Sequence, residues 1–486
     1  MTIKEELMNI VGAANVTDEA PRLESYSKDN SLCAPGRPSY IVQIKSTAEV
    51  LRVVKLANIN KIPVTPCSSG IHFYGNTIPV QAGIILDLGK MNKILAIDDR
   101  NRMVRFEPGV TWGQLQAELR KQDLMAISPL LPHPLKSALT SHLEREPRLI
   151  PKFEYTDSLV TMEIVLPDGE LFRTGSASAP GFPEKSFAQG VNPSGPGDFM
   201  WNRIFQGAQG TFGVVTWTQC KIEYRPKVNK TYLIPFKNLD DAANFIYKIQ
   251  WHEVGEECLL LNNVDLAAIL TEEWPGDFQK LQKSLAPWTL IMVLGGGKRL
   301  PEQKIAYEDN ALKEVAGELA IATLPTAIPG MPGIERKLPD MLRNPWPEDK
   351  TYWKFGHKGS CEDLFFLTRL NETEKFLRII QEIADKYNYP ANDIGVYIQP
   401  MVYGGACHFE CSFYYDADNT SEVNAVNELY LEAAATVLDR GGFFSRPYGP
   451  IAGMVYNRTA NYTMTLKKLK KVLDPNNIMS PGRLCF

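Results

Sequence analysis

Two stretches of small residues, more than a hundred positions apart, carry the strongest chemical signal in the chain. Residues 65–75 read TPCSSGIHFYG, and residues 205–216 read FQGAQGTFGVVT. Each stretch places short side chains at the end of a predicted strand, where backbone N–H groups can approach a charged ligand unobstructed. Because a pyrophosphate needs such donors, the two stretches together predict a dinucleotide site.

Neither stretch matches the two most familiar phosphate-binding motifs. Residues 65–75 lack the Gly-Lys-Ser/Thr sequence that a P-loop nucleotide hydrolase needs. The G-x-G-x-x-G pattern of a Rossmann dinucleotide site is also missing. A tightly held NAD is therefore disfavoured.

A strand, a helix and a second strand are predicted immediately before the first stretch. Residues 41–44 are strand-like, Ser46 and Glu49 have the spacing of a capping box that begins a helix, and residues 62–64 form the next strand. Four apolar residues between positions 50 and 57 recur at i, i+3, i+4 and i+7, which places them on one helix face. The first stretch therefore follows a βαβ unit.

Strand and helix patterns alternate through the rest of the chain, with short connections as far as about residue 226. Such a pattern is typical of an α+β nucleotide-binding domain. Residues 324–349 are rich in proline and show no clear periodicity, so we expect a long loop that shapes a site. The predicted strands are 83–88, 103–109, 160–165, 171–173, 232–236, 259–261, 288–294, 352–355, 364–367, 396–400 and 407–415, and the predicted helices are 112–122, 239–251, 304–319, 372–387 and 420–439.

The balance of charge argues against nucleic acid as a partner. The 486 residues include 52 basic and 56 acidic ones, and the basic ones are scattered except at 467–471, which we interpret as the exposed face of a short helix. No stretch approaches the ~20 apolar residues that a membrane span requires, and no secretory segment begins the chain. Eight cysteines without a C-x-x-C pair indicate neither a zinc site nor thioredoxin chemistry. We therefore expect a cytoplasmic protein.

Five motifs in the same order resemble the FAD-binding domain of the vanillyl-alcohol oxidase and p-cresol methylhydroxylase superfamily. The resemblance covers residues 38–224 and the tail. Its motifs are residues 63–77, 83–92, 107–115, 205–216 and 473–482.

The resemblance implies an α+β fold of three parts. A two-part FAD-binding domain spans residues 1–226, an α+β cap domain with an antiparallel sheet spans 227–440, and a C-terminal segment, 441–486, returns to the FAD domain. It also implies that FAD lies against Pro66, Ser68, Ser69, Gly70, Ile71, His72, Gly75, Pro108, Gly109, Ser137, Ser141, Gly207, Gly210, Thr211, Gly213 and Val215.

Two departures from the family pattern affect the cofactor site. Residues 136–147 replace a segment that is glycine-rich in many relatives, although Ser137 and Ser141 are still expected beside the flavin. Some relatives bind flavin covalently through a histidine in the first loop, and His72 lies one place beyond that position. We therefore expect noncovalent FAD and a structural or substrate-facing role for His72.

In the cap domain, His408 is the candidate base for a substrate hydroxyl proton. His408 and Glu410 share one face of a predicted strand, and a neighbouring carboxylate raises the basicity of a histidine. A hydrogen-bonded structural histidine is the alternative. Related D-2-hydroxy-acid dehydrogenases carry an H-x-G-D-G-N-x-H pattern here. His408 matches only its last histidine and Met401 replaces the first, so His408 and Glu410 are weak candidates for a metal site and we expect no metal.

Residues 443–449 loosely resemble the Tyr-Arg segment with which vanillyl-alcohol oxidases hold a phenolate. Arg446 takes the place of the arginine, and Ser445 replaces the tyrosine. Arg446 is thus the candidate that binds a substrate carboxylate or phenolate, and a surface salt bridge is its alternative. Tyr448 is a further catalytic candidate. Tyr397, Gln399 and Tyr403 are expected to line the pocket or to belong to the core.

The resulting hypothesis is an FAD-dependent dehydrogenase or oxidase that transfers a hydride from a small alcohol, hydroxy acid or aromatic alcohol to flavin N5. A D-2-hydroxy-acid dehydrogenase that feeds an electron-transfer flavoprotein or a quinone is one alternative, and a non-catalytic flavoprotein subunit of a redox complex is another. The electron acceptor is left open between these partners and oxygen. The oligomeric state is also open, with a homo-oligomer among the alternatives.

Overall fold

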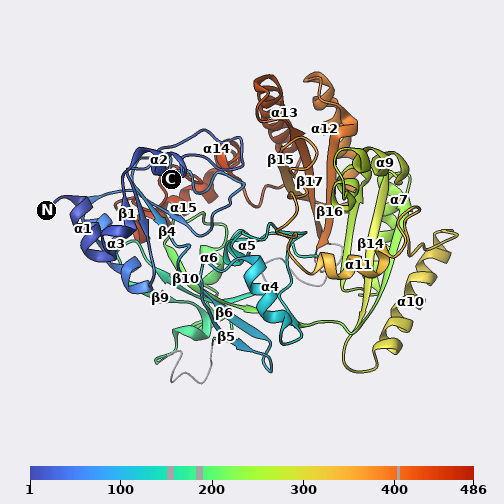
Figure 1. The fold of residues 1–486 in the computed structure, drawn as a ribbon, viewed down its shortest axis with the longest axis horizontal. Helices are drawn as coiled ribbons and strands as arrows, with labels where there is room; N and C mark the ends of the chain where they lie inside the picture. Colours follow the sequence, from blue (N-terminus) through green and yellow to red (C-terminus); the bar gives the residue numbers. More distant parts are fainter. Residues whose placement is uncertain (150–157, 182–189, 402–404) are drawn as a thin grey trace.

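The computed structural model describes residues 1–149, 158–181, 190–401 and 405–486 (Figure 1). The elements of the N-terminal half lie on the left of Figure 1, and a large sheet with its helices lies on the right. The α+β fold class predicted from the sequence is confirmed. Tyr403 lies outside the described residues.

The first sheet carries the first small-residue loop at the end of a strand. Its order is β1-β2-β4-β3, with β2, β4 and β3 parallel and β1 antiparallel at the edge. As predicted, the Ser46 hydroxyl accepts the N–H of Glu49 at the start of α3, and the four apolar residues of that helix are buried. The elements are α1 (Ile3–Val11), β1 (Val16–Thr17), α2 (Ala20–Glu24), β2 (Tyr40–Gln43), α3 (Thr47–Asn60), β3 (Val64–Cys67) and β4 (Ile84–Asp87).

The second sheet is antiparallel, has the order β5-β6-β10-β8-β9, and carries the second small-residue loop just before β10. The hydroxyl of Thr111 caps α4, as its spacing predicts. Strand β5 is absent from the sequence prediction, and none of its residues is fully buried. The elements are β5 (Ile94–Asp98), β6 (Met103–Phe106), α4 (Trp112–Arg120), α5 (Ala138–Leu143), β8 (Leu159–Val165), β9 (Leu171–Arg173), α6 (Asn202–Phe205) and β10 (Val214–Lys221), with the short pair β7 (Leu124–Met125) and β11 (Glu223–Tyr224).

The third sheet has six antiparallel strands in the order β12-β14-β13-β16-β17-β15. Helices α7, α10, α12 and α13 bury one face, and α8 and α11 lie against the other. The elements are β12 (Val228–Phe236), α7 (Leu239–Trp251), β13 (Glu257–Asn262), α8 (Asn263–Leu270), α9 (Gly276–Ser284), β14 (Trp288–Gly296), α10 (Pro301–Glu318), α11 (Ile334–Leu342), β15 (Ser360–Thr368), α12 (Thr373–Lys386), β16 (Ile394–Met401), β17 (Ala406–Tyr415) and α13 (Thr420–Asp439).

Two predictions in this region are wrong. Residues 324–349 include a helix, α11, whose Ile334, Leu338 and Leu342 recur every four residues and are buried. The surrounding prolines obscured this pattern. Residues 352–355 form turns instead of a strand, because their aromatic side chains pack inward around a cavity.

The C-terminal segment, with α14 (Gly449–Arg458) and α15 (Ala460–Leu473), ties the two small-residue loops together. Met479 pairs with Val64 beside the first loop. The buried ammonium of Lys470 donates to the carbonyl oxygens of Thr211 (2.7 Å) and Met479 (2.8 Å) and to Asp474 (2.7 Å). The prediction that the lysine run is wholly exposed is therefore wrong at Lys470.

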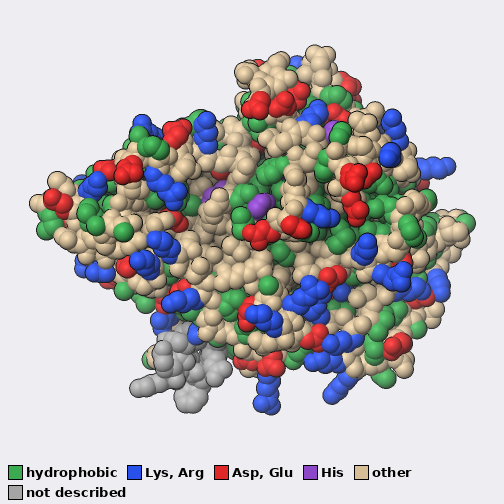
Figure 2. All heavy atoms as spheres, viewed as in Figure 1, with side chains coloured by type: hydrophobic (Ala, Val, Ile, Leu, Met, Phe, Trp, Pro, Cys, Tyr) green, Lys and Arg blue, Asp and Glu red, His purple; other side chains and the backbone are tan. Residues whose placement is uncertain are grey.

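Charged side chains of both signs are intermingled over the face shown in Figure 2, without a single basic patch. All eight cysteines have free thiols. No helix in the part of the chain that the structure describes has the length and apolar character of a membrane span.

Candidate active site

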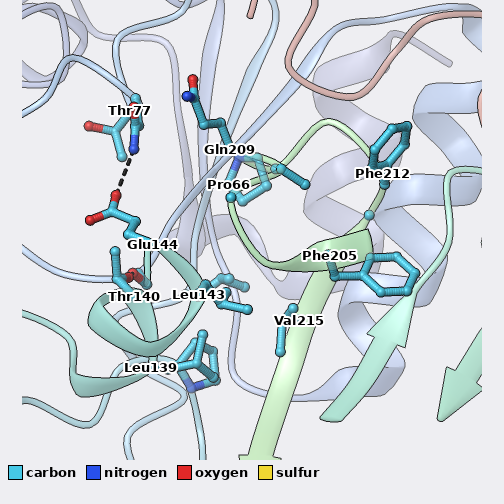
Figure 3. Close-up of a pocket in the computed structure, with 18 of the residues that line it drawn as sticks. Pro66, Thr77, Leu139, Thr140, Leu143, Glu144, Phe205, Gln209, Phe212 and Val215 are labelled. Atoms are coloured by element: carbon cyan, nitrogen blue, oxygen red, sulfur yellow. Dashed lines mark hydrogen bonds between the residues drawn. The ribbon is translucent and has the colours of Figure 1, made fainter. Parts of the chain in front are cut away.

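A cavity with about 820 Å³ of empty space, part of it open to solvent, lies where the two small-residue loops meet α5 (Figure 3). Glu144 and Thr140 lie on one side of it, and Phe205, Phe212 and Val215 lie on the other. The cavity therefore has a polar wall and an apolar wall, as an elongated ligand with a polar and a ring portion requires.

Half of the residues predicted to bind the cofactor line this cavity. They come from β3 and its loop, from the residue pair after β6, and from the segment leading into β10. They are Pro66, Ser68, His72, Pro108, Gly207, Gly210, Gly213 and Val215.

The other predicted residues support the wall from behind. Ser137 caps α5 and donates to the carbonyl of Pro108 (2.6 Å), and Ser141 accepts the indole N–H of Trp112 (2.9 Å). The hydroxyls of Ser69 and Thr211 donate to carbonyl oxygens of their own loops, and the N–H of Gly75 donates to the Asp29 carboxylate (2.6 Å). Gly109 packs on neighbouring carbonyls, and Gly70 and Ile71 belong to the first loop. None of these eight is a cavity-lining residue.

Sequence reasoning missed most of the polar wall. Asn76, Thr77, Thr140 and Glu144 line the cavity, and the hydroxyls of Thr140 and Ser68 are hydrogen-bonded (2.5 Å). Asn76 and Thr77 lie in the predicted motif 63–77, and the departure at residues 136–147 was the signal for Thr140 and Glu144. That departure was read as missing glycines, whereas it supplies a helix with side chains that face the cavity. The missed apolar residues are Leu88, Leu139, Leu143, Phe205, Ala208 and Phe212, and polar Gln209 was missed as well.

The loops fit a pyrophosphate-containing dinucleotide. The N–H groups of Ser68, Ser69, Gly70 and Ile71 donate to no acceptor among the described residues, which leaves them available to an anion. Gly210 has a φ of +74°, and a Cβ there would come within 3.0 Å of the Ser480 hydroxyl and 3.1 Å of Pro66. Glycine therefore keeps this part of the cavity open.

Three ionisable groups lie together at the polar end of this cavity. They are also close to a second cavity. Lys136 forms an ion pair with Glu146 and lies 3.6 Å from Glu144, whose other oxygen accepts the Asn76 amide (2.6 Å). Burial raises the pKa of Glu144 to about 7 against the opposing charge of Lys136. Although burial would also raise the pKa of Glu146, Lys136 and Arg446 hold it below its usual value.

The second cavity, of about 570 Å³, lies between the first loop and the third sheet. Six of its lining residues carry aromatic rings, and it contains three buried cations and three carboxylates. It is lined by Phe73, Tyr74, Pro129, Leu130, Pro132, His133, Lys136, Glu146, Pro147, Tyr352, Trp353, Lys354, Asp363, Tyr397, Glu410 and Arg446.

Arg446 is the cation of this cavity that forms no salt bridge with a described carboxylate, although Glu146 and Glu144 lie near enough to raise its pKa. The residue is 5% exposed, it forms no salt bridge among the described residues, and its guanidinium lies 4.2 Å from the centre of the Phe365 ring. Its Nη1 has no hydrogen-bond partner in the described part of the chain. A buried, unpaired guanidinium is costly unless an anion binds it.

His408 lies behind the cavity wall and does not line it. Its Nε2 faces Glu410 Oε2 at 3.0 Å, which confirms that the two side chains share a strand face, and Glu410 stands between it and the cavity. Burial lowers the pKa of His408, so the ring is neutral near neutral pH and donates Nε2–H to Glu410. No group of three metal-binding side chains occurs among the described residues.

Tyr448 stacks on Tyr74, with ring centroids 4.8 Å apart and an interplanar angle of 5°. The pair separates the second cavity, which Tyr74 lines, from a smaller one that Tyr74 and Tyr448 both line. Tyr397 lines the second cavity, and Gln399 is fully buried and donates to the Cys258 carbonyl (2.9 Å). Gln399 is therefore a core residue.

Comparison with known proteins gives two family matches and full-length relatives. Residues 38–175 match the model of an FAD binding domain, and residues 225–484 match that of the C-terminal domain of FAD linked oxidases. The chain is 24% identical to the glycolate oxidase subunit GlcD of Bacillus subtilis, covering 99% of this chain and 96% of that protein. It is 28% identical to a D-lactate dehydrogenase of Anaerostipes hadrus, covering 95% and 93%.

The fold is also that of a solved flavoprotein structure. The crystal structure of p-cresol methylhydroxylase with substrate bound superposes with a TM-score of 0.82 at 22% identity, covering 99% of this chain and 96% of that one. At this identity the likeness shows the shared fold.

Proposed function

The chain belongs to the FAD-linked oxidases, with FAD as its cofactor, and from that premise we propose that it oxidises a CH–OH group of a small organic alcohol, hydroxy acid or aromatic alcohol. FAD, when bound, supplies a hydride acceptor at N5 of its flavin ring. The chain's own residues bind the substrate, orient it, and take up its hydroxyl proton.

The residues around the larger cavity would hold FAD without a covalent bond. Free N–H groups between Ser68 and Ile71 suit the pyrophosphate, and the glycines before β10 let the cofactor approach the backbone. His72 contacts the Ser69 carbonyl and the Cys67 thiol within its own loop. These contacts hold its Nε2, which supports a structural role for His72.

Arg446 would anchor the substrate in the second cavity, and its unpaired burial is the observation that carries this proposal. A carboxylate or phenolate would satisfy Nη1 and neutralise the guanidinium, with aromatic residues such as Tyr352 and Tyr397 around the organic part. The aromatic walls also exclude water from the reacting carbon.

Glu144 is better placed than His408 to accept the hydroxyl proton. Its Oε2 lacks a hydrogen-bond partner among the described residues and lies 3.6 Å from Lys136, which lines the second cavity, while Glu144 itself lines the larger cavity. Its pKa of about 7 suits a group that exchanges protons near neutral pH. His408 reaches the second cavity only through Glu410. We therefore assign His408 a supporting role, in which it fixes the orientation of Glu410.

Anaerobic bleaching of the flavin against hydroxy acids and phenolic alcohols tests the proposal. Arg446→Lys should keep FAD bound but lower the affinity for the substrate that bleaches the flavin by about tenfold or more, because a lysine cannot reproduce a bidentate contact. Arg458→Met is the control, since Arg458 pairs with Asp439 at the surface. Equal loss of flavin content and turnover in Arg446→Lys would show that the residue is structural.

The electron acceptor is addressed by the same experiment. Readmission of oxygen restores the colour rapidly if oxygen is the acceptor. Slow recovery that a quinone or an electron-transfer flavoprotein accelerates supports the dehydrogenase alternative. Protein that takes up FAD but bleaches with no substrate of the panel favours a non-catalytic subunit.

A further inference from the structure

A turn between α11 and β15 presents two side-chain donors to the second cavity. Lys354 is 9% exposed, and its ammonium contacts Asp363 Oδ2 (2.5 Å) and Glu410 Oε1 (2.7 Å). An ammonium carries three N–H donors. The third has no acceptor among the described residues, although Lys354 lines the cavity.

Trp353, the preceding residue, presents a second unsatisfied donor. It is 1% exposed, it lines the same cavity, and its indole Nε1–H has no acceptor among the described residues. A buried N–H without an acceptor costs free energy that an incoming oxygen atom would recover. The Lys354 ammonium lies 5.1 Å from the centre of this indole ring, so the two donors are neighbours.

The lysine is held firmly by strands of the third sheet. Asp363 also accepts the Ser412 hydroxyl (2.9 Å), and Glu410 is fixed by His408. Although burial would lower it, Asp363 and Glu410 hold the pKa of Lys354 well above its usual value. The ammonium is therefore charged and positioned before any ligand arrives, which is what makes a donor selective.

We propose that Lys354 and Trp353 form a second substrate-binding point, which donates hydrogen bonds to an oxygen atom of the substrate while Arg446 binds its anionic group. The inference rests on the proposed function, because it places the substrate in the same cavity. It defines the substrate class as an organic anion that carries a second oxygen function, such as a hydroxyl or carbonyl group. An otherwise identical anion that lacks this oxygen atom should bind more weakly, because it leaves the donors of Lys354 and Trp353 unsatisfied.

Calorimetric titration of pre-reduced holoenzyme and of FAD-free protein tests the proposal without turnover. The probes are two matched pairs: D-lactate with propanoate, and 4-hydroxybenzyl alcohol with 4-methylphenol. In the pair that binds, Lys354→Met should lower the affinity for the member with the additional hydroxyl group by about ten- to a hundredfold, as the loss of a charge-assisted hydrogen bond implies. The affinity for the other member should stay nearly unchanged. Trp353→Phe, which keeps the ring, should lower the affinity for the member with the additional hydroxyl group by about two- to tenfold.

Two controls separate the outcomes. Lys358→Met removes a lysine of the same turn that pairs with Asp393, and it should change neither member of a pair. Arg446→Met should weaken both members equally. Suppose that Arg446→Met lowers both affinities, but Lys354→Met and Trp353→Phe lower both affinities equally or change neither. The second binding point is then refuted, whereas the anion site at Arg446 is supported. If Arg446→Met changes nothing, or neither pair binds the wild type, the proposed function itself fails.

Discussion

Replacing Glu144 by glutamine should change how the stability of the protein depends on pH. The folded pKa of about 7 lies above the usual value of 4.5, because burial disfavours the charged carboxylate. Between these two values the folded state binds more protons than the unfolded state, so the free energy of unfolding falls as pH rises through this window and is level above it. Since one pKa unit is equivalent to about 1.36 kcal/mol, ionised Glu144 costs up to about 3 kcal/mol at pH 8.

Glutamine cannot ionise, so Glu144→Gln should match the wild type near pH 4.5 and exceed its stability at pH 8. The measurement is the difference in melting temperature between variant and wild type across that range, in FAD-free protein. The buried histidines have lowered pKa values, which make stability rise with pH below about 6.5. Their contribution is the same in variant and wild type, so it cancels in the difference. Glu382→Gln, on the exposed face of α12, is the control and should show no pH-dependent difference. A Glu144→Gln difference that is constant from pH 4.5 to 8 would refute a raised pKa and show Glu144 to be a permanently charged partner of Lys136.

Two further substitutions test the loops and the tail. Gly210→Ala should cost about 1–3 kcal/mol and reduce FAD content, because its positive φ and close neighbours oppose a Cβ, whereas Gly317→Ala, at an exposed position of α10, meets nothing within 4 Å and should retain FAD. Lys470→Met should lower the stability by about 3–5 kcal/mol, since it leaves Asp474 charged and buried, whereas exposed Lys468→Met should stay within about 0.5 kcal/mol, both measured by denaturant unfolding. Normal FAD content in Gly210→Ala would contradict the need for glycine at this position. Unchanged stability in Lys470→Met would contradict the buried ion pair with Asp474.

Local patterns predicted part of the backbone that lines the larger cavity but few of its side chains. Pro66, Gly210 and Val215 line the cavity as expected, because small residues next to strand ends leave a sequence signal that does not depend on distant partners. Glu144 was missed because its function depends on burial beside Lys136 and Asn76, which no sequence spacing reports. The bounds of the three predicted domains and the catalytic roles of individual residues remain predictions.

The amino-acid sequence by itself determined the strands and helices with clear periodicity and the two glycine-rich loops, and its lack of a Rossmann motif disfavoured NAD, while FAD was implied by the resemblance of five motifs to a known family. The strands, helices and loops follow from side-chain size, spacing and capping, which act over a few residues. Only the tertiary structure decided that Arg446 is buried without a salt bridge among the described residues, that His408 lies behind Glu410, and that Lys354 completes the second cavity. Each of these depends on desolvation and on charges brought together from remote strands, which is a property of the packed molecule.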